Sequence, residues 1–349
     1  MDYIKRQKKL LKSIESRSLD ALLVRKKQNI SYLTGTKGDD AVLFVSSSKM
    51  VLITDARYKE EYAKSIKNCR LSIFKGSDIY TCINELSKKT RSKRIGFESD
   101  NFSYSGYISL KKKSKDIAFV PVKGLVESFR VIKDSDEVSC IREACRYGSK
   151  VINFGMRIVR PSISELTVKK KIEQFMGARE IEKADFDIIV ASGKNASMPH
   201  ASSSKKNIRK GDMVVIDLGA VSYGYNSDLT RTVFLGKIER KFSRIYNIVL
   251  DAQKRAIENI RPGVSIRYID NISRQYISRK GFGRYFIHNL GHGIGLEVHE
   301  MPNMSKNNNA LLEQNMTLTI EPGIYIPGWG GVRLEDVVLV TKDGCEVLT

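Results

Sequence analysis

The sequence predicts a mixed α+β protein, with a smaller α/β domain over residues 1–130 followed by a strand-rich domain over residues 131–349. Three observations support this prediction. The chain has 349 residues, more than one small module needs. Apolar residues make up 41% and charged residues 28%, a globular composition that can bury a large core without disulfides or zinc. Strand and helix signals alternate in the first part, whereas strands dominate the second.

The first 130 residues alternate short apolar runs with stretches of helical spacing. Strands are expected where apolar and β-branched residues cluster, and helices where apolar residues recur three or four positions apart. The expected elements, in order, are a strand at 21–24, a hairpin of strands at 41–45 and 50–54 around a turn at 46–49, helices at 59–67 and 78–89, and a strand at 94–97.

A domain boundary is expected between residues 127 and 133. The run 134–137 then offers N-cap candidates and acidic first-turn residues for a helix that runs towards Gly155, and Ser164 is the expected cap of a second helix that opens at 161–165. The remaining expected elements are strands at 186–191, 213–218, 231–234, 316–320 and 332–340, with helices at about 243–260 and 266–280 between them. The local sequence shows no internal repeat.

The charge is strongly positive but unevenly distributed. The 60 Lys+Arg and 39 Asp+Glu residues give a net charge of +21, which would suit a nucleic-acid partner. Residues 1–130 hold 28 of the basic and 14 of the acidic residues, a net +14, whereas residues 281–337 hold three basic and six acidic residues, a net −3. We interpret the excess as a solvated basic surface and expect no nucleic-acid partner.

The sequence favours a cytoplasmic protein that does not bind membranes. No run approaches 18 apolar residues, and the basic start of the chain is not followed by the apolar stretch of a secretory signal. The five cysteines fit reduced thiols better than a disulfide framework. Cys140 and Cys145 lie on one predicted helix and point about 140° apart, so they are not expected to pair.

Two aspartates mark the ends of neighbouring strands. Asp217 ends the apolar run 213–218, where a buried carboxylate needs a partner charge or a metal. Asp228 follows eleven residues later on the next predicted strand, and a turn at Tyr223-Gly224 can bring both carboxylates side by side. Adjacent carboxylates repel unless a divalent cation lies between them. The alternative is that each aspartate is an ordinary turn residue.

All four histidines lie within one hundred residues of this chain. They are His200, His288, His292 and His299. The segment 288–300 is rich in glycine, is therefore expected to be irregular, and lacks the H-E-x-x-H spacing of a zinc-binding helix. Its glycines at 291, 293 and 295 would let the backbone approach closely, as a tight site requires. The alternative is a glycine-rich turn with incidental histidines.

Two glutamates add to these candidates. Glu321 ends the predicted strand 316–320 and is followed by Pro-Gly. Glu335 lies early in the predicted strand 332–340, where alternation places it on one face with Arg333. An ordinary ion pair between Arg333 and Glu335 is the alternative interpretation.

Together these side chains form a carboxylate-rich set with one imidazole: Asp217, Asp228, His292, Glu321 and Glu335. Such a set suits two divalent metal ions, and the excess of carboxylates favours Mn²⁺ over Co²⁺, Zn²⁺ or Fe²⁺. Carboxylates can bridge two metals about 3.5–4 Å apart, and such a pair acidifies a water and stabilises the oxyanion of an attacked carbonyl.

The sequence resembles the pita-bread metallopeptidases of the aminopeptidase P and prolidase group. The motifs that carry this resemblance lie at 192–200, 215–219, 227–232, 291–295, 298–300, 321–325 and 333–336, with further matches at 29–35 and 54–58. The resemblance implies a creatinase/prolidase-like amino-terminal domain at 1–130 and a pita-bread catalytic domain at 131–349. It also implies a homodimer.

The resemblance implies a role for each site residue. Asp217 would hold one metal, Asp228 and Glu335 would bridge both, and His292 and Glu321 would complete the second site. Glu321 would also move a proton. The residues implied to line the substrate pocket or support the ligands are His200, His288, His299 and Arg333. All five metal positions are present, which disfavours creatinases and non-catalytic relatives.

The implied reaction is metal-dependent hydrolysis of the Xaa-Pro bond in proline-containing peptides, a bond without an N–H that general peptidases handle poorly. Prolidases commonly carry an Arg soon after the His-Glu pair, but this chain has Asn303 there and no Arg between His299 and Glu321. We therefore predict an Xaa-Pro aminopeptidase. The alternative is an Xaa-Pro dipeptidase, and a remote alternative is a non-catalytic basic scaffold that binds nucleic acid or protein.

Overall fold

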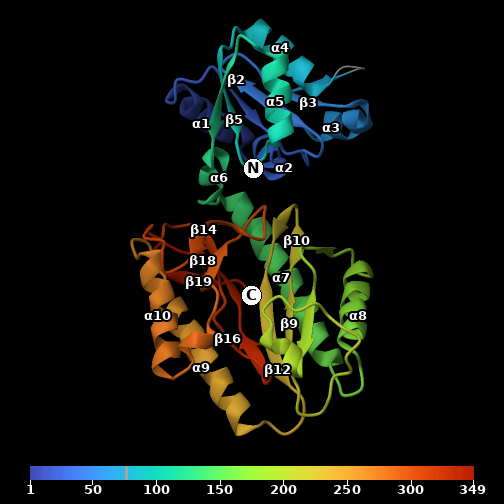
Figure 1. Ribbon diagram of the computed structural model, residues 1–349, viewed down its shortest axis with the longest axis vertical. Helices are drawn as coiled ribbons and strands as arrows, with labels where there is room; N and C mark the ends of the chain where they lie inside the picture. The colour runs from blue at the N-terminus through green and yellow to red at the C-terminus, as the bar shows by residue number, and fades with distance from the viewer. Residues whose placement is uncertain (75–77) are drawn as a thin grey trace. The chain divides into compact units, whose positions relative to one another are not determined.

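A computed structural model describes residues 1–74 and 78–349, and Figure 1 traces the chain. The chain divides into two compact units, Met1–Arg130 and Val131–Thr349. These are the two ranges that the sequence analysis separates. Within the described residues, none of the helices combines the length and apolar character that crossing a membrane demands.

The first unit is built on one six-stranded sheet with the strand order β4-β3-β2-β1-β5-β6. Its elements are α1 (Tyr3–Glu15), β1 (Ala21–Val24), α2 (Lys27–Thr34), β2 (Val42–Ser46), β3 (Met50–Thr54), the 3₁₀ helix η1 (Ala56–Tyr58), α3 (Lys59–Ser65), β4 (Arg70–Ile73), α4 (Ile79–Thr90), β5 (Arg94–Glu98), α5 (Tyr104–Lys113), β6 (Ala118–Val122) and α6 (Leu125–Arg130). The six elements predicted for this unit are confirmed, to within a few residues.

Both faces of this sheet are covered. Strand β2 pairs with β3 as the predicted antiparallel hairpin, whereas β1 and β5 run parallel. Ile83 of α4 and Leu110 of α5 pack with Phe44 on one face. Leu22 and Leu52, which alternate to the other face, are also fully buried. Parallel strands buried on both faces are typical of an α/β domain.

The second unit contains four small sheets and four long helices. Its elements are α7 (Ser135–Ile158), α8 (Glu165–Gly177), β7 (Glu182–Lys183), β8 (Ile189–Ser192), η2 (Gly193–Ser197), β9 (Met213–Leu218), β10 (Ala220–Ser222), β11 (Tyr225–Asn226), β12 (Leu229–Phe234), α9 (Arg240–Ile257), α10 (Ile266–Arg279), η3 (Gly283–Tyr285), β13 (Gly291–Gly293), β14 (Glu300–Met304), β15 (Thr317–Ile320), β16 (Gly323–Ile326), β17 (Gly330–Arg333), β18 (Asp336–Val340) and β19 (Cys345–Val347). The sheets have the orders β11-β10-β7, β12-β9-β8, β14-β13-β15-β18-β19 and β16-β17.

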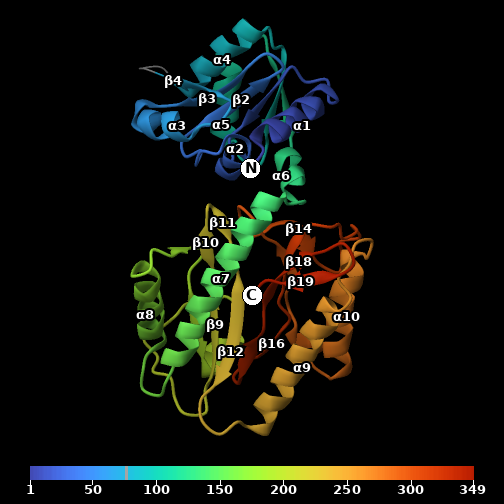
Figure 2. The same ribbon diagram turned by 180° about the vertical axis from the view of Figure 1, so that it is seen from behind.

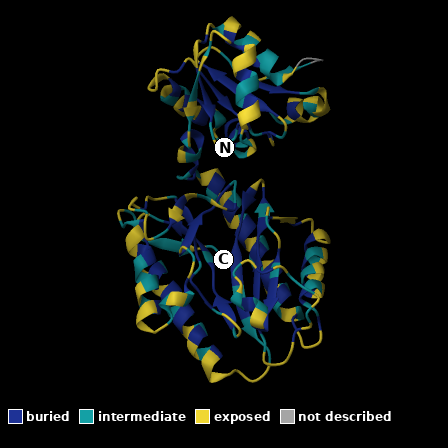
Figure 3. Ribbon diagram, viewed as in Figure 1, coloured by how far each residue is buried: buried dark blue, intermediate teal, exposed yellow. Residues whose placement is uncertain are grey.

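The helices of this unit lie outside its strands (Figures 1 and 2). Helices α7 and α8 pack on the sheet of β8, β9 and β12, and α9 and α10 pack on the strands from β13 onwards. Of the cap candidates in 134–137, Asp134 caps α7 and forms a capping box with Glu137, and Ser164 caps α8 as predicted. Figure 3 shows the strands buried and the outer faces of the helices exposed. The strand ends are thereby enclosed between two helical layers.

Three local predictions are wrong. The strand predicted at 332–340 is two strands in different sheets, because the chain leaves β17 at Arg333 and enters β18 at Asp336. Apolar alternation alone did not reveal this break. The strand predicted at 186–191 begins only at Ile189. Asp228 precedes strand β12 rather than lying on it.

Candidate metal centre

Five acidic or imidazole side chains gather where strands of two sheets end. Asp217 lies on β9, and its register partner on β12 is Thr230, so Asp228 comes close to Asp217 as predicted. A short hairpin, β10–β11, lies between these strands and turns at Tyr223-Gly224. The other members are His292 on β13, Glu321 directly after β15, and Glu335 between β17 and β18.

The glycine-rich segment contains a strand, so the predicted irregularity is wrong for residues 291–293. Strand β13 lies between β14 and β15 and carries His292. A Cβ on Gly291 would lie 2.0 Å from the carbonyl oxygen of Thr319, and a Cβ on Gly293 would lie 2.2 Å from that of Met301. The close approach predicted for these glycines is confirmed, because no side chain fits there.

The carboxylates of this cluster are buried but incompletely satisfied. Asp217, Asp228 and Glu335 are 9%, 5% and 2% exposed, and among the described residues one oxygen of each finds no hydrogen-bond partner: Asp217 Oδ1, Asp228 Oδ1 and Glu335 Oε1. One ligand atom from each of the three lies within 4.8 Å of those of the others. Buried carboxylate oxygens that face one another are costly unless a cation compensates them.

The imidazole of His292 presents a lone pair to two carboxylates. Its Nδ1 lies 3.1 Å from the carbonyl oxygen of Gly293, which can only accept, so Nδ1 carries the proton. Nε2 then lies unprotonated 3.3 Å from Oε1 of Glu321 and 3.7 Å from Oδ2 of Asp228. Burial lowers the pKa of His292 to about 3 and keeps it neutral. Only a cation between these atoms turns three facing acceptors into favourable ligands.

The electrostatics of the carboxyl groups indicate the same need. Burial, followed by the charges of Glu335 and Asp217, raises the pKa of Asp228 well above its ordinary value. Burial, followed by Glu321 and Asp217, does the same for the pKa of Glu335. Burial also raises the pKa of Glu321 to about 7. The protein alone therefore does not provide enough positive charge for this set of anions.

Arg333 pairs with Asp217 and not with Glu335, so the predicted alternative of an Arg333–Glu335 ion pair is wrong. Glu335 lies in the break between β17 and β18 and contacts the Arg333 guanidinium only through the Thr230 hydroxyl, which donates to Glu335 Oε2 at 2.6 Å. The guanidinium donates from Nη2 to Oδ2 of Asp217 at 2.5 Å, from Nε to Thr230 Oγ1 at 3.0 Å, and from Nη1 to the hydroxyl of Tyr325 at 2.9 Å. Arg333 is 4% exposed, and its bond to Asp217 holds that carboxylate in place.

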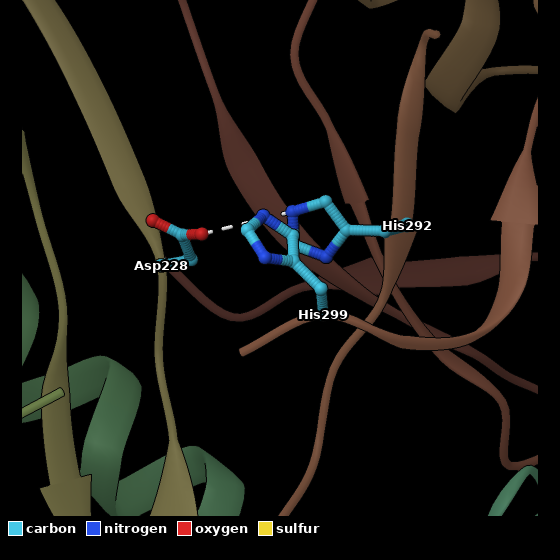
Figure 4. A group of neighbouring side chains, drawn as sticks. All are labelled: Asp228, His292 and His299. Atoms are coloured by element: carbon cyan, nitrogen blue, oxygen red, sulfur yellow. Dashed lines mark ion pairs between the residues drawn. The ribbon is translucent and has the colours of Figure 1, made fainter. Parts of the chain in front are cut away.

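The three remaining histidines differ in their surroundings. His288 has both nitrogens engaged, Nδ1 with the carbonyl of Asn289 at 2.7 Å and Nε2 with the hydroxyl of Tyr325 at 3.0 Å, and burial lowers its pKa to about 4. His299 is exposed, with its ring 4.2 Å from that of His292. In Figure 4 the rings of His292 and His299 lie side by side and both face Asp228.

His299 also belongs to a possible ligand group with Asp228 and His292. His200 is exposed at the end of the segment that follows η2. Its charge and those of Arg333 and Arg274 lower the pKa of His288, after the larger effect of burial. The structure thus brings all nine sequence-predicted site residues to one region of the second unit.

Comparison with protein families matches both units. The model for metallopeptidase family M24 matches residues 139–342, and that for the creatinase/prolidase N-terminal domain matches residues 6–132. The chain belongs to metallopeptidase family M24. Its fold is the pita-bread catalytic fold preceded by a creatinase-type amino-terminal domain, as the resemblance implies.

Named relatives of this M24 chain are similar over nearly its whole length. A protein from Pyrococcus horikoshii named Xaa-Pro dipeptidase is 38% identical, covering 98% of this chain and 96% of that one. A structure described as an Xaa-Pro dipeptidase from Bacillus anthracis has a TM-score of 0.95 at 37% identity, covering 100% and 98%. A structure described as an X-Pro aminopeptidase from Thermotoga maritima has a TM-score of 0.90 at 32% identity, covering 99% and 97%.

The residues of this M24 site fit divalent cations, because the unpartnered carboxylate oxygens and the Nε2 lone pair of His292 are electron-pair donors that face one another.

The sequence analysis gave no role to three residues that hold the site together. Thr230 donates to Oε2 of Glu335 at 2.6 Å, and Thr319 accepts from the backbone N–H of His292 at 3.0 Å. Tyr325 links Arg333 to His288. Thr230 and Tyr325 lie inside recognised motifs, whereas Thr319 is a strand threonine with no distinguishing signal.

Proposed function

We propose that this M24 enzyme hydrolyses Xaa-Pro dipeptides with two divalent cations. The observation that carries the proposal is the set of buried, unpartnered carboxylate oxygens beside the Nε2 of His292. Relatives named Xaa-Pro dipeptidase at 37–38% identity, over almost the full length of each chain, favour the dipeptide. The sequence prediction preferred an aminopeptidase, and these comparisons support its alternative better.

The prediction of an aminopeptidase depended on Asn303. Asn303 lies on β14 opposite His292 of β13, and register partners in an antiparallel pair project to the same face of the sheet. Its exposed side chain therefore lies on the metal-facing side, where its amide also accepts from Nδ2 of Asn289 at 3.4 Å. The neutral amide N–H of Asn303 can still donate a hydrogen bond to a carboxylate, so the absence of an Arg does not prevent dipeptide binding.

The five candidate residues Asp217, Asp228, His292, Glu321 and Glu335 would hold the cations. Bound divalent cations supply Lewis acidity, which lowers the pKa of a water and polarises a peptide carbonyl. We propose Mn²⁺, because carboxylate oxygens outnumber the single imidazole nitrogen. The Arg333 guanidinium would keep the Asp217 carboxylate oriented, since it holds one of its oxygens and leaves the other free.

Other side chains would bind the peptide and move protons. Glu321 would take a proton from the attacking water and deliver it to the proline nitrogen, which otherwise leaves as a poor amide anion. His299 and His200 are exposed and would donate hydrogen bonds to the peptide carbonyl. His288 would orient the Tyr325 hydroxyl, because both of its nitrogens are already engaged.

The test is a direct comparison of substrates. The protein is stripped of metal, given Mn²⁺, and assayed with an Xaa-Pro dipeptide and an Xaa-Pro-Yaa tripeptide that share the same first residue. The expected result is a higher kcat/KM for the dipeptide, and loss of both activities in Asp228→Ala. Asp343→Ala, an exposed aspartate of the same unit, is the control and should behave as wild type. A higher kcat/KM for the tripeptide would restore the aminopeptidase assignment.

We also propose that the enzyme works in the cytoplasm as a homodimer, without a nucleic-acid partner. None of the five cysteines, all of which lie in the described residues, forms a disulfide, which suits a reducing compartment. Sedimentation of the purified chain measures the oligomeric state, and a monomer at all concentrations would contradict the dimer.

A further inference from the structure

We propose that Glu165 is a positioning residue that fixes the loop 193–203 and thereby sets the place of His200 in the substrate pocket. Glu165 is the first residue of α8, is fully buried, and belongs to none of the recognised motifs. It contacts neither a ligand residue nor the substrate histidines. The inference rests on the proposed function, because His200 matters only if a peptide binds there.

The Glu165 carboxylate accepts hydrogen bonds from both ends of this loop. Oε1 accepts from the backbone N–H and the hydroxyl of Ser192, both at 2.7 Å. Oε2 accepts from the backbone N–H of Ser204 at 3.1 Å and from its hydroxyl at 2.6 Å. The amide of Asn195 donates to both oxygens at 3.1 Å. Ser192 and Ser204, twelve positions apart in the sequence, are thus bound to the same carboxylate.

This arrangement is specific for a carboxylate. Every hydrogen bond to the Glu165 side chain is donated by its partner. A carboxylate suits this position, because both of its oxygens accept and it has no hydrogen to donate. Lys206 fixes the direction of the Ser192 hydroxyl, because its Nζ donates to Ser192 Oγ at 2.7 Å and leaves the hydroxyl hydrogen for Glu165. A glutamine at position 165 would point an N–H₂ group at other donors.

The middle of the loop contacts two residues beside the candidate metal centre, Arg333 and Gly331. Nη1 of Arg333 donates to the carbonyl oxygen of Pro199 at 3.2 Å. A Cβ on Gly331 of β17 would lie 2.1 Å from the carbonyl oxygen of Ala196, so the two backbones are in close contact. The His200 side chain has no hydrogen-bond partner among the described residues, and its position therefore depends on the loop backbone. Glu165 thus holds both ends of the loop, and Arg333 holds its backbone at Pro199.

The test compares Glu165→Gln with Glu173→Gln, a control on the same helix that forms no hydrogen bond within the described residues. In Glu165→Gln we expect KM for the Xaa-Pro dipeptide to rise at least about fivefold, with little change in kcat and in bound metal per chain. Limited trypsin digestion should cleave faster after Lys194, which is exposed in the loop, while cleavage elsewhere stays at the wild-type rate. Unchanged KM and unchanged cleavage at Lys194 would overturn the proposal.

A swap of partners separates positioning from general destabilisation. Asn195→Asp alone sets two carboxylates against each other and should also raise KM, whereas Glu165→Gln with Asn195→Asp restores one donor–acceptor pair and should recover part of the loss. A double variant that is worse than both single variants would contradict the proposed pairing. If wild-type protein cleaves no Xaa-Pro peptide, the proposed function fails, but cleavage at Lys194 still decides whether Glu165 holds the loop.

Discussion

Arg333 and Asp217 show how one residue pair serves the metal centre. The guanidinium uses three nitrogens on four acceptors, and one of them is an oxygen of a candidate ligand. A buried ion pair contributes little net stability, yet removing one partner leaves an uncompensated charge or unpaired acceptors. Arg142 and Glu346 form another of the Arg–carboxylate pairs of this unit, but on the surface. The two pairs therefore allow a matched experiment.

We predict that Arg333→Met lowers the free energy of unfolding of the metal-free protein by about 3–5 kcal/mol, because it leaves the buried carboxylate of Asp217 without its positive partner. Arg142→Met should cost at most about 1 kcal/mol, because water replaces the lost partner. Urea unfolding followed by circular dichroism measures both. Equal losses in the two variants would show that burial of the Arg333 pair does not govern its effect.

Asn303 is the residue at which substrate length can be tested. A dipeptide presents the proline carboxylate to the pocket, and a guanidinium binds it more strongly than a neutral amide does. We predict that Asn303→Arg lowers KM for an Xaa-Pro dipeptide by about tenfold, or 1.4 kcal/mol, and leaves KM for a tripeptide nearly unchanged. Steady-state kinetics with both substrates measure the effect, with Asn307→Arg, an exposed position in the next loop, as control. A parallel change for both substrates would contradict a carboxylate contact.

At the scale of elements, the site depends on close backbone contact between strands. β13 lies between β14 and β15, and two of its three residues are glycines with no room for a Cβ. The atoms in the way are backbone carbonyls, which cannot move aside without breaking the sheet. The glycines thus fix how near His292 comes to Glu321.

We predict that Gly291→Ala displaces β13, lowers metal binding at least about tenfold and destabilises the fold, because a Cβ would lie 2.0 Å from the Thr319 carbonyl. Gly177→Ala is the control, since nothing lies within 4 Å of its Cβ and it ends a helix, where alanine is neutral or mildly stabilising. Isothermal titration with Mn²⁺ and thermal melting measure both variants. Tight metal binding by Gly291→Ala would show that the strand tolerates the displacement.

At the scale of the whole molecule, charge is separated along the chain. The first unit carries a net charge of +14, whereas residues 281–337, which hold three of the five ligand residues, are net negative. The second unit also buries carboxyl groups whose pKa values are raised. Metal-free protein must keep these groups protonated to stay at its most stable, so its stability and metal binding both depend on pH.

We predict that metal-free wild-type protein loses stability relative to metal-free Glu321→Gln as the pH rises from about 4.5 to about 7. A carboxyl group with a raised pKa stabilises the fold fully below its ordinary value, 4.5 for Glu321, and this contribution is lost as the pH rises to about 7. Glu321 alone accounts for about 3 kcal/mol over this range. The buried histidines oppose this loss, because burial lowers the pKa of His288 to about 4 and that of His292 to about 3, so the comparison with Glu321→Gln is needed to isolate the glutamate.

Calorimetry of chelator-treated protein measures this fall. Glu321→Gln should flatten the dependence, and added Mn²⁺ should abolish it by holding the carboxylates as anions. A difference in Tm between wild type and Glu321→Gln that stays constant over this range would mean that Glu321 is ionised throughout in the folded protein.

The sequence by itself determined the α+β organisation, the division at about residue 130, the main helices and the candidate ligand set. These follow from local signals: apolar periodicity, caps such as Ser164, and carboxylates placed at strand ends. The family motifs implied a role for each of the nine candidate site residues, and the structure brings those residues together.

Only the tertiary structure decided which side chains are the partners of the buried charges. Period-2 alternation placed Arg333 and Glu335 on one face of a single strand, but the chain breaks between them and Arg333 reaches Asp217 on another strand. Glu165 gave no signal at all, because a glutamate after an N-cap is ordinary in any helix. Strand ends and buried acceptors are local features that a sequence displays, whereas the partner of a buried charge depends on which strands meet, and packing settles that.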